Sequence, residues 1–160
     1  MIRTEQEYQE AIRRYKEDLD VNTKMRAQFR EMGLNEQETE KAMEPLLCFE
    51  SQLAEEITWY ENVIRGHIAP TKRLTDTGRL LIALRIARHM TQKQLAQRLG
   101  VSEANVSRDE RNEYHAVTVE KAQRILDALG VSVTTQVDPL LPESHHSAVE
   151  PEANSPVGRR

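Results

Sequence analysis

The sequence predicts an all-α protein, and two kinds of observation support this prediction. Apolar residues recur at steps of three and four over much of the chain, which is the spacing of one face of an amphipathic helix. Ser, Thr or Asn residues stand where such stretches begin and Gly residues stand where they end, as is typical of helix caps. One segment, residues 131–137, alternates apolar and polar residues in the manner of a strand. The pattern leaves a short strand there open as the one exception, with an irregular segment as the alternative.

Residues 1–66 are predicted to form a helical module with two amphipathic stripes. Gly33 ends the first stripe, and Asn35 with Glu38 has the pattern of a capping box that opens a short helix. Pro45 costs a helix interior one hydrogen bond, so we expect it either to begin a new helix or to kink one. The economical arrangement is a helical hairpin, or a helical pair that serves as a dimerisation module. The two stripes are Tyr8, Ile12, Tyr15, Leu19, Met25, Phe29 and Met32, and then Leu46, Phe49, Leu53, Ile57, Tyr60 and Ile64.

The charge of the chain is unevenly distributed, although the whole chain carries a net charge of −4. Lys and Arg against Asp and Glu number 9 to 15 in residues 1–70, 11 to 7 in residues 71–137 and 2 to 4 in residues 138–160. The positive excess therefore lies in the middle of the chain, where a nucleic-acid backbone could use it. We expect a linker at 67–75 and a middle domain at 76–137. Proline and polar residues dominate 138–160, and we expect a disordered tail there.

The middle segment has the helix boundaries of a compact four-helix domain. Thr91 with Gln94 has the pattern of a capping box, Gly100 ends the helix that follows, and Ser102 caps the next one. The helices are expected near residues 76–89, 92–99, 103–111 and 119–129. A short helix, a tight turn that contains Gly and a second short helix together indicate a helix-turn-helix.

The stretch from Met90 to Ser102, MTQKQLAQRLGVS, resembles the core of the Cro/CI-type (XRE) repressor family. The resemblance continues through Val106 and Glu110 to Val131 and covers little more than a third of the chain. It implies a lambda repressor-like helix-turn-helix domain in a sequence-specific transcriptional regulator, which we expect to be a repressor.

This resemblance also implies which residues meet DNA, because the helix near 103–111 would enter the major groove. Glu103, Ala104 and Arg108 would read base edges, and Arg108 suits the O6/N7 edge of guanine. Gln92 resembles the phosphate-contacting glutamine of the family, at a helix N-terminus whose partial positive charge favours phosphate. The other phosphate candidates are Lys93, Ser102, Asn105, Arg111 and Asn112.

Four residues of the expected domain have structural roles or depart from the family pattern. The resemblance implies an ion pair of Arg85 with Glu110, which would orient the helix near 103–111. Asp109 stands where relatives place an apolar residue, and its carboxylate needs a partner, with Arg111, Tyr114 and His115 nearest in sequence. Asn112 replaces a common Gly and tolerates a positive backbone dihedral.

The sequence holds no constellation typical of an enzyme. We find no Ser-His-Asp pattern, no phosphate-cradling Gly loop and no His or Cys spacing suited to a metal, so no catalytic residue, metal or cofactor is expected. We expect the lone Cys48 to pack on its apolar stripe. The chain has no apolar run of about 20 residues and no signal peptide, so no membrane partner is expected. The expected location is the cytoplasm, associated with the nucleoid.

The expected partners are double-stranded DNA and a second copy of the chain. The helix near 76–89 is apolar nearly all round, so its Leu80, Ile82 and Ile86 need cover from residues 1–66, a second subunit or both. An alternative is an antitoxin whose residues 1–66 bind a toxin, since this acidic region suits a basic partner. A second alternative is a helical scaffold in which the middle domain binds protein.

Overall fold

The computed structural model describes residues 1–136, and the regular elements in that part of the chain are all helical. The predicted all-α class is therefore confirmed. Val137 and the predicted tail at 138–160 lie outside the described residues. In chain order the elements are α1 (Glu5–Glu31), α2 (Glu36–Ile64), the 3₁₀ turn η1 (Leu74–Asp76), α3 (Thr77–Ala87), α4 (Gln92–Leu99), α5 (Glu103–Arg111) and α6 (Val119–Leu129).

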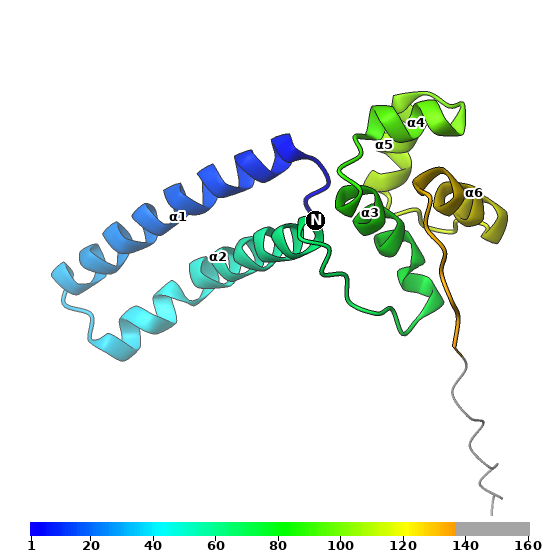
Figure 1. The fold of residues 1–160 in the computed structure, drawn as a ribbon. Coiled ribbons are helices and arrows are strands. Elements are labelled where there is room, and N and C mark those ends of the chain that lie inside the picture. Colours follow the sequence, from blue (N-terminus) through cyan, green and yellow to red (C-terminus); the bar gives the residue numbers. More distant parts are fainter. Residues whose placement is uncertain (137–160) are drawn as a thin grey trace, which may run out of the picture.

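Helices α1 and α2 form a long antiparallel hairpin that projects from the group α3–α6 (Figure 1). The expected capping box begins α2, since Asn35 Oδ1 accepts from the Glu38 amide at 3.0 Å and the Glu38 carboxylate accepts from the Asn35 amide at 2.9 Å. The prediction of a short helix there is wrong, because α2 runs on through Pro45 as one element. A proline removes a single backbone hydrogen bond, and the apolar face that α2 packs on α1 holds the turns on either side.

The contact between α1 and α2 buries a narrow strip that contains polar as well as apolar groups. Met43 and Thr39 of α2 are fully buried, and Asn22 of α1 donates to Glu50 at 2.6 Å. Cys48 was expected to pack on this strip but is exposed. It lies one residue before Phe49, which is itself 65% exposed, so this part of α2 points both side chains to solvent.

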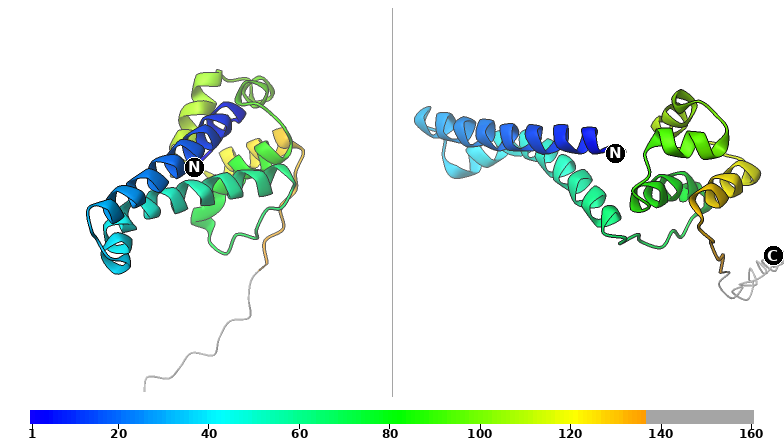
Figure 2. Two further views of the ribbon diagram at one scale, coloured as in Figure 1. Left: turned by 90° about the vertical axis from the view of Figure 1, so that its left-hand side faces the viewer. Right: turned by 45° about the horizontal axis from the view of Figure 1, so that its top comes forward.

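Helix α3 lies on the side of the second group that faces the hairpin and contacts α2 and α6, while α4 contacts both α5 and α6 (Figures 1 and 2; Figure 2 gives two further views). The four helices predicted for this segment are all present. Every helix of the group contributes residues to an apolar core. They include Leu81, Ile82, Ala83, Ile86, Leu95, Ala96, Val106, Ala122, Ile125 and Leu129.

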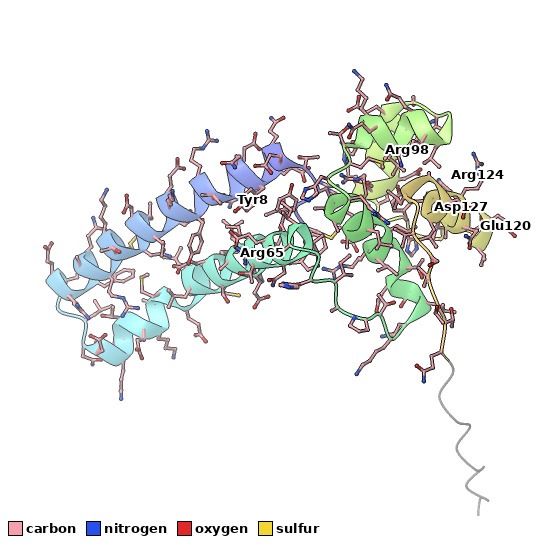
Figure 3. All side chains as sticks on the ribbon, in the orientation of Figure 1. Tyr8, Arg65, Arg98, Glu120, Arg124 and Asp127 are labelled. Carbon is pink, nitrogen blue, oxygen red and sulfur yellow. The ribbon has the colours of Figure 1, made fainter. Side chains whose placement is uncertain are left out.

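The hairpin covers the second apolar face of α3. Tyr60 and Val63 at the end of α2 are 4% and 2% exposed, and they share one apolar core with Ile82 and Ile86. Tyr8, labelled in Figure 3, reaches from α1 to stack on Tyr60, with ring centroids 4.9 Å apart. Burial, more than the nearby Glu5 carboxylate, raises the pKa of Tyr60 to about 12. Within one chain, residues 1–64 therefore help to cover Ile82 and Ile86, whereas Leu80 is only half-buried and lies outside this core.

Residues 131–136 have no regular secondary structure, so the alternative of an irregular segment holds there and the strand that the pattern left open does not form. Residues 132–136 are exposed, and the described part of the chain offers no other strand for them to pair with. A strand without a partner leaves its backbone groups unpaired, so this exposed segment stays irregular. None of the helices within residues 1–136 has the length and apolar character that crossing a membrane requires.

Candidate nucleic-acid interface

The turn between α4 and α5 is built from local capping interactions. Thr91 Oγ1 accepts from the Gln94 amide at 3.1 Å, and the Gln94 side chain accepts from the Thr91 amide at 2.8 Å. Gly100 ends α4 with φ of 69°, a left-handed conformation that costs other residues free energy. Ser102 Oγ then accepts from the Asn105 amide at 3.2 Å and begins α5. This is the geometry of a helix-turn-helix.

Helix α5 has one buried and one exposed side. Val106 and Glu110 are 2% and 0% exposed and face the domain interior. Leu95 and the small Ala96 of α4 are also buried, which allows α4 and α5 to cross closely. The predicted DNA-contacting residues other than Gln92 are exposed: Lys93, Ser102, Glu103, Ala104, Asn105, Arg108, Arg111 and Asn112.

A buried ion pair holds the C-terminal end of α5 against α3. Arg85 Nε and Nη2 lie 2.5 and 2.7 Å from the two carboxylate oxygens of Glu110, in a bidentate arrangement. The side chain of Arg85 is 4% exposed and that of Glu110 is fully buried. Arg85 also donates through Nη1 to the Met90 carbonyl oxygen at 2.7 Å, so the connection between α3 and α4 belongs to the same network.

Gln92, at the first position of α4, is tied to this network. Its side-chain Nε2 donates to Glu110 Oε2 at 2.8 Å, and the residue is half-buried. Glu110 therefore accepts from Arg85 and Gln92 together. The beginning of α4 and the end of α5 are thus joined through one carboxylate, which fixes the two helices relative to each other.

Arg108 lies on the exposed side of α5, and its Nη2 donates to Asn105 Oδ1 at 3.0 Å. Arg108 and Asn105 were predicted as separate DNA-contacting residues. Their spacing of three places both on one face of the helix. Asn105 therefore orients the Arg108 guanidinium along α5. The planar guanidinium retains further N–H groups that can donate to a base edge.

The expected partners of Asp109 are wrong. Its carboxylate lies 2.8 Å from Lys121 Nζ on α6, and not against Arg111, Tyr114 or His115. The partner comes from the next helix along the chain, and the Lys121 side chain is 48% exposed. The pair links α5 to α6 at the edge of the domain, where solvent screens it.

The turn after α5 contains the buried Tyr114 and lies against Gly78 of α3. Neither residue was predicted to contribute to the packing here. Asn112 has φ of −89°, and the left-handed residues are Glu113, Tyr114 and Ala116, with φ of 50°, 51° and 56°. Tyr114 is 5% exposed, and burial, followed by the charge of Glu110, raises its pKa. Gly78 of α3 lies against the Glu113 carbonyl group. A glycine at the start of an apolar helix was the available signal for this close approach.

Some of the positive charge of the domain stabilises the fold. Arg88 donates to the Gly130 carbonyl oxygen and Arg98 to the Ala128 carbonyl oxygen, both at 2.8 Å. These carbonyl groups close α6, whose C-terminal end carries partial negative charge. Figure 3 labels Arg98 on α4 with Arg124 and Asp127 on the neighbouring α6. The two arginines therefore contribute less to a DNA surface than the net charge of the segment indicates.

Within residues 1–136, no group of three His, Cys, Asp or Glu side chains is arranged to hold a metal ion. What the described part of the chain presents instead is a short capped helix, a left-handed Gly turn and a second helix with a polar exposed side. A fold and surface of this kind define a helix-turn-helix DNA-binding domain.

Residues 81–136 match a family model described as helix-turn-helix. Residues 81–136 therefore form a helix-turn-helix domain of the Cro/CI (XRE) type, and domains of this type are regulatory and bind double-stranded DNA. Comparison with curated proteins and with solved structures finds no match.

Proposed function

We propose that this protein is a transcriptional repressor that recognises a specific DNA sequence by inserting α5 into the major groove. The observation that carries the proposal is the two-sided character of α5. Val106 and Glu110 anchor one side in the domain, while Glu103, Ala104 and Arg108 stand exposed on the helix. A helix fixed in this way can present side chains to base edges without bending.

Each exposed residue of α5 suits a particular contact. Arg108 can donate two hydrogen bonds to guanine O6 and N7, Glu103 can accept from the cytosine amino group, and Ala104 can touch the thymine methyl group. Gln92 and Lys93 at the start of α4 suit one stretch of phosphates. Ser102, Asn105, Arg111 and Asn112 suit the flanking phosphates.

Replacing Arg108 by Ala is expected to lower discrimination at one base position by roughly 1–3 kcal/mol. Gln92→Ala is expected to weaken binding to all sequences about equally, because a phosphate contact carries no base information. The measurement is the dissociation constant on a site selected from random DNA and on unselected DNA. Arg13→Ala on α1, whose side chain is 74% exposed, is the control and should change neither value. Equal losses for Arg108→Ala on both DNAs would contradict its assignment as a base reader.

The repressor is proposed to act as a homodimer. One small domain reads only a few base pairs, too few to stand out from competing genomic sites. Two copies of α5 about 34 Å apart would read a palindromic site. Much of the α2 stripe is used inside the chain, since Tyr60 is buried and Leu53, Ile57 and Ile64 are partly buried. Phe49 remains exposed and is the member of that stripe most available to a second copy.

We expect light scattering to give the mass of a dimer for the unmodified chain at micromolar concentration without DNA. Phe49→Glu is expected to raise the dimer dissociation constant at least tenfold, because it places a charge on the apolar contact. Val119→Glu on α6 is the control, since Val119 is 82% exposed and lies outside the hairpin. A monomeric unmodified chain would contradict the dimer.

A second candidate function is that of an antitoxin, and the composition of α2 favours it. This helix carries eight glutamates and one lysine, on a hairpin that projects from the DNA-binding group (Figure 1). We expect such an antitoxin to copurify with a small basic protein. Glu44→Lys with Glu55→Lys should weaken that complex at least tenfold, whereas Glu17→Lys on α1 should not. Absence of salt-dependent DNA binding would instead favour the helical scaffold.

A further inference from the structure

We propose that Ile2 and the backbone carbonyl of Arg3 position α4 and α5 for DNA, so that the seating of the hairpin on α3 sets DNA affinity. The inference rests on the proposed function and adds residues outside the helix-turn-helix domain to it. The contact that carries it is a hydrogen bond of 2.8 Å from Arg85 Nη2 to the Arg3 carbonyl oxygen. It joins residues 82 positions apart in the chain.

The Arg3 carbonyl completes the hydrogen bonding of a buried cation. Arg85 is 3% exposed, so solvent cannot replace a missing acceptor. Its other acceptors are Glu110 and the Met90 carbonyl oxygen, both within the helix-turn-helix domain. Arg3 is the one acceptor from the hairpin side among the described hydrogen bonds of this side chain. Loss of that acceptor would leave a buried N–H unpaired, which is costly.

The position of the Arg3 carbonyl is fixed from both sides. Ile2 before it is 4% exposed and belongs to the apolar core that Tyr60 shares with Ile86. Thr4 after it caps α1 by accepting from the Glu7 amide at 3.2 Å. The Arg3 amide donates to the Glu7 carboxylate at 2.7 Å. An apolar anchor and a helix cap thus hold this peptide group in place.

The network continues from Arg85 to the DNA-facing residues. Glu110, the partner of Arg85, closes the last turn of α5 and accepts from Gln92 at the start of α4. A movement of Arg3 is therefore passed through two hydrogen-bonded side chains to both helices of the motif. A cavity of about 280 Å³ lies at this junction and is lined by Arg3, Gln92 and Glu103, among others. The cavity leaves Gln92 room to change its rotamer when the network loosens.

The coupling is reciprocal, because a contact that favours DNA binding is itself favoured by bound DNA. A partner that holds the hairpin against α3 would strengthen DNA binding, and one that draws the hairpin away would weaken it. Binding of a partner to the hairpin would in this way change the DNA affinity of α5, although the hairpin itself does not contact DNA.

A double-mutant cycle in the full chain tests the coupling. Ile2→Ala loosens the anchor of Arg3, and we expect it to raise the dissociation constant for the selected DNA site at least threefold. Met43→Ala is the matched control, since it opens a cavity at a fully buried site in the distal hairpin, away from the network, and should change DNA binding less than twofold. Binding is measured at a temperature at which circular dichroism shows both variants folded.

Combination with Gln92→Ala separates positioning from general destabilisation. If the network positions Gln92, the loss caused by Gln92→Ala is at least threefold smaller in the Ile2→Ala chain than in the unmodified chain. Additive effects, or equal effects of Ile2→Ala and Met43→Ala, would overturn the coupling. If Ile2→Ala does not fold, Ile2→Val takes its place with a smaller effect of the same sign. Absence of DNA binding by the unmodified chain would overturn the proposed function itself, whereas binding that ignores Ile2 overturns the coupling alone.

Discussion

Glu110→Ala is expected to lower the free energy of unfolding by about 3–5 kcal/mol, because it leaves the buried Arg85 charge without its counter-ion. The Glu110 carboxylate is fully buried and accepts from two Arg85 nitrogens and from Gln92, so the variant removes three hydrogen bonds at once. The Arg85 side chain, 4% exposed, cannot reach solvent without displacing the core of α3. Urea unfolding followed by circular dichroism measures the change.

The matched control is Glu36→Ala at the surface pair of Glu36 with Arg30. That pair has an N–O distance of 2.9 Å but side chains that are 58% and 55% exposed, so we expect a loss below about 1 kcal/mol. Joint replacement by Arg85→Met and Glu110→Leu should be more stable than Glu110→Ala, because neither buried charge remains. Equal losses in the free energy of unfolding for Glu110→Ala and Glu36→Ala would show that burial does not set the energetic cost of breaking the Arg85–Glu110 pair.

Much of the fold could be predicted because its signals are local. The capping boxes at Asn35 and Thr91 and the left-handed Gly100 specify helix ends through residues within three or four positions of each other. Such interactions depend little on the rest of the chain. The bounds expected for α4 and α5 were therefore correct to the residue, and the exposed side of α5 followed from them.

The features that could not be predicted depend on contacts between distant segments. Lys121 reaches Asp109 from α6, 12 residues further along the chain, and nothing in the sequence near Asp109 indicates that partner. The continuity of α2 through Pro45 depends on the packing of α1 against it. The Arg3 carbonyl is a backbone group, so no residue type identifies it as an acceptor for Arg85.

Charge was a weak guide to the interface because several arginines of the middle segment are engaged within the fold. Residues 71–137 have a positive excess, yet Arg85 is buried with Glu110, and Arg88 and Arg98 donate to carbonyl groups at the end of α6. The net charge includes these arginines, although each of them has a partner within the fold. The exposed cations of α4 and α5 that make no such hydrogen bond to a backbone carbonyl group are Lys93, Arg108 and Arg111, a smaller set than the net charge indicates.

Gly78→Ala is expected to destabilise the protein by about 3 kcal/mol or more, although Ala is the better helix former. A Cβ at this position would overlap with the carbonyl oxygen of Glu113, and it would lie 2.8 Å from the carbonyl carbon and 3.1 Å from Tyr114 Cβ. The obstacle is backbone, which cannot rotate away as a side chain can. Left-handed dihedrals at Glu113, Tyr114 and Ala116 already strain the opposing turn, so it has little freedom to retreat.

The control for this prediction is Gly33→Ala in the turn between α1 and α2. Gly33 has φ of 89° and no neighbour within 4 Å of a Cβ, so this variant reports backbone strain without overlap, about 1–2 kcal/mol. Gly78→Ala has overlap without a positive φ. Because the overlapped turn directly follows α5, Gly78→Ala should also weaken DNA binding, whereas Gly33→Ala should not. If the Gly78→Ala protein were as stable as the unmodified chain, a Cβ would fit between α3 and the turn after α5. The close approach of Gly78 to the Glu113 carbonyl group would then be contradicted.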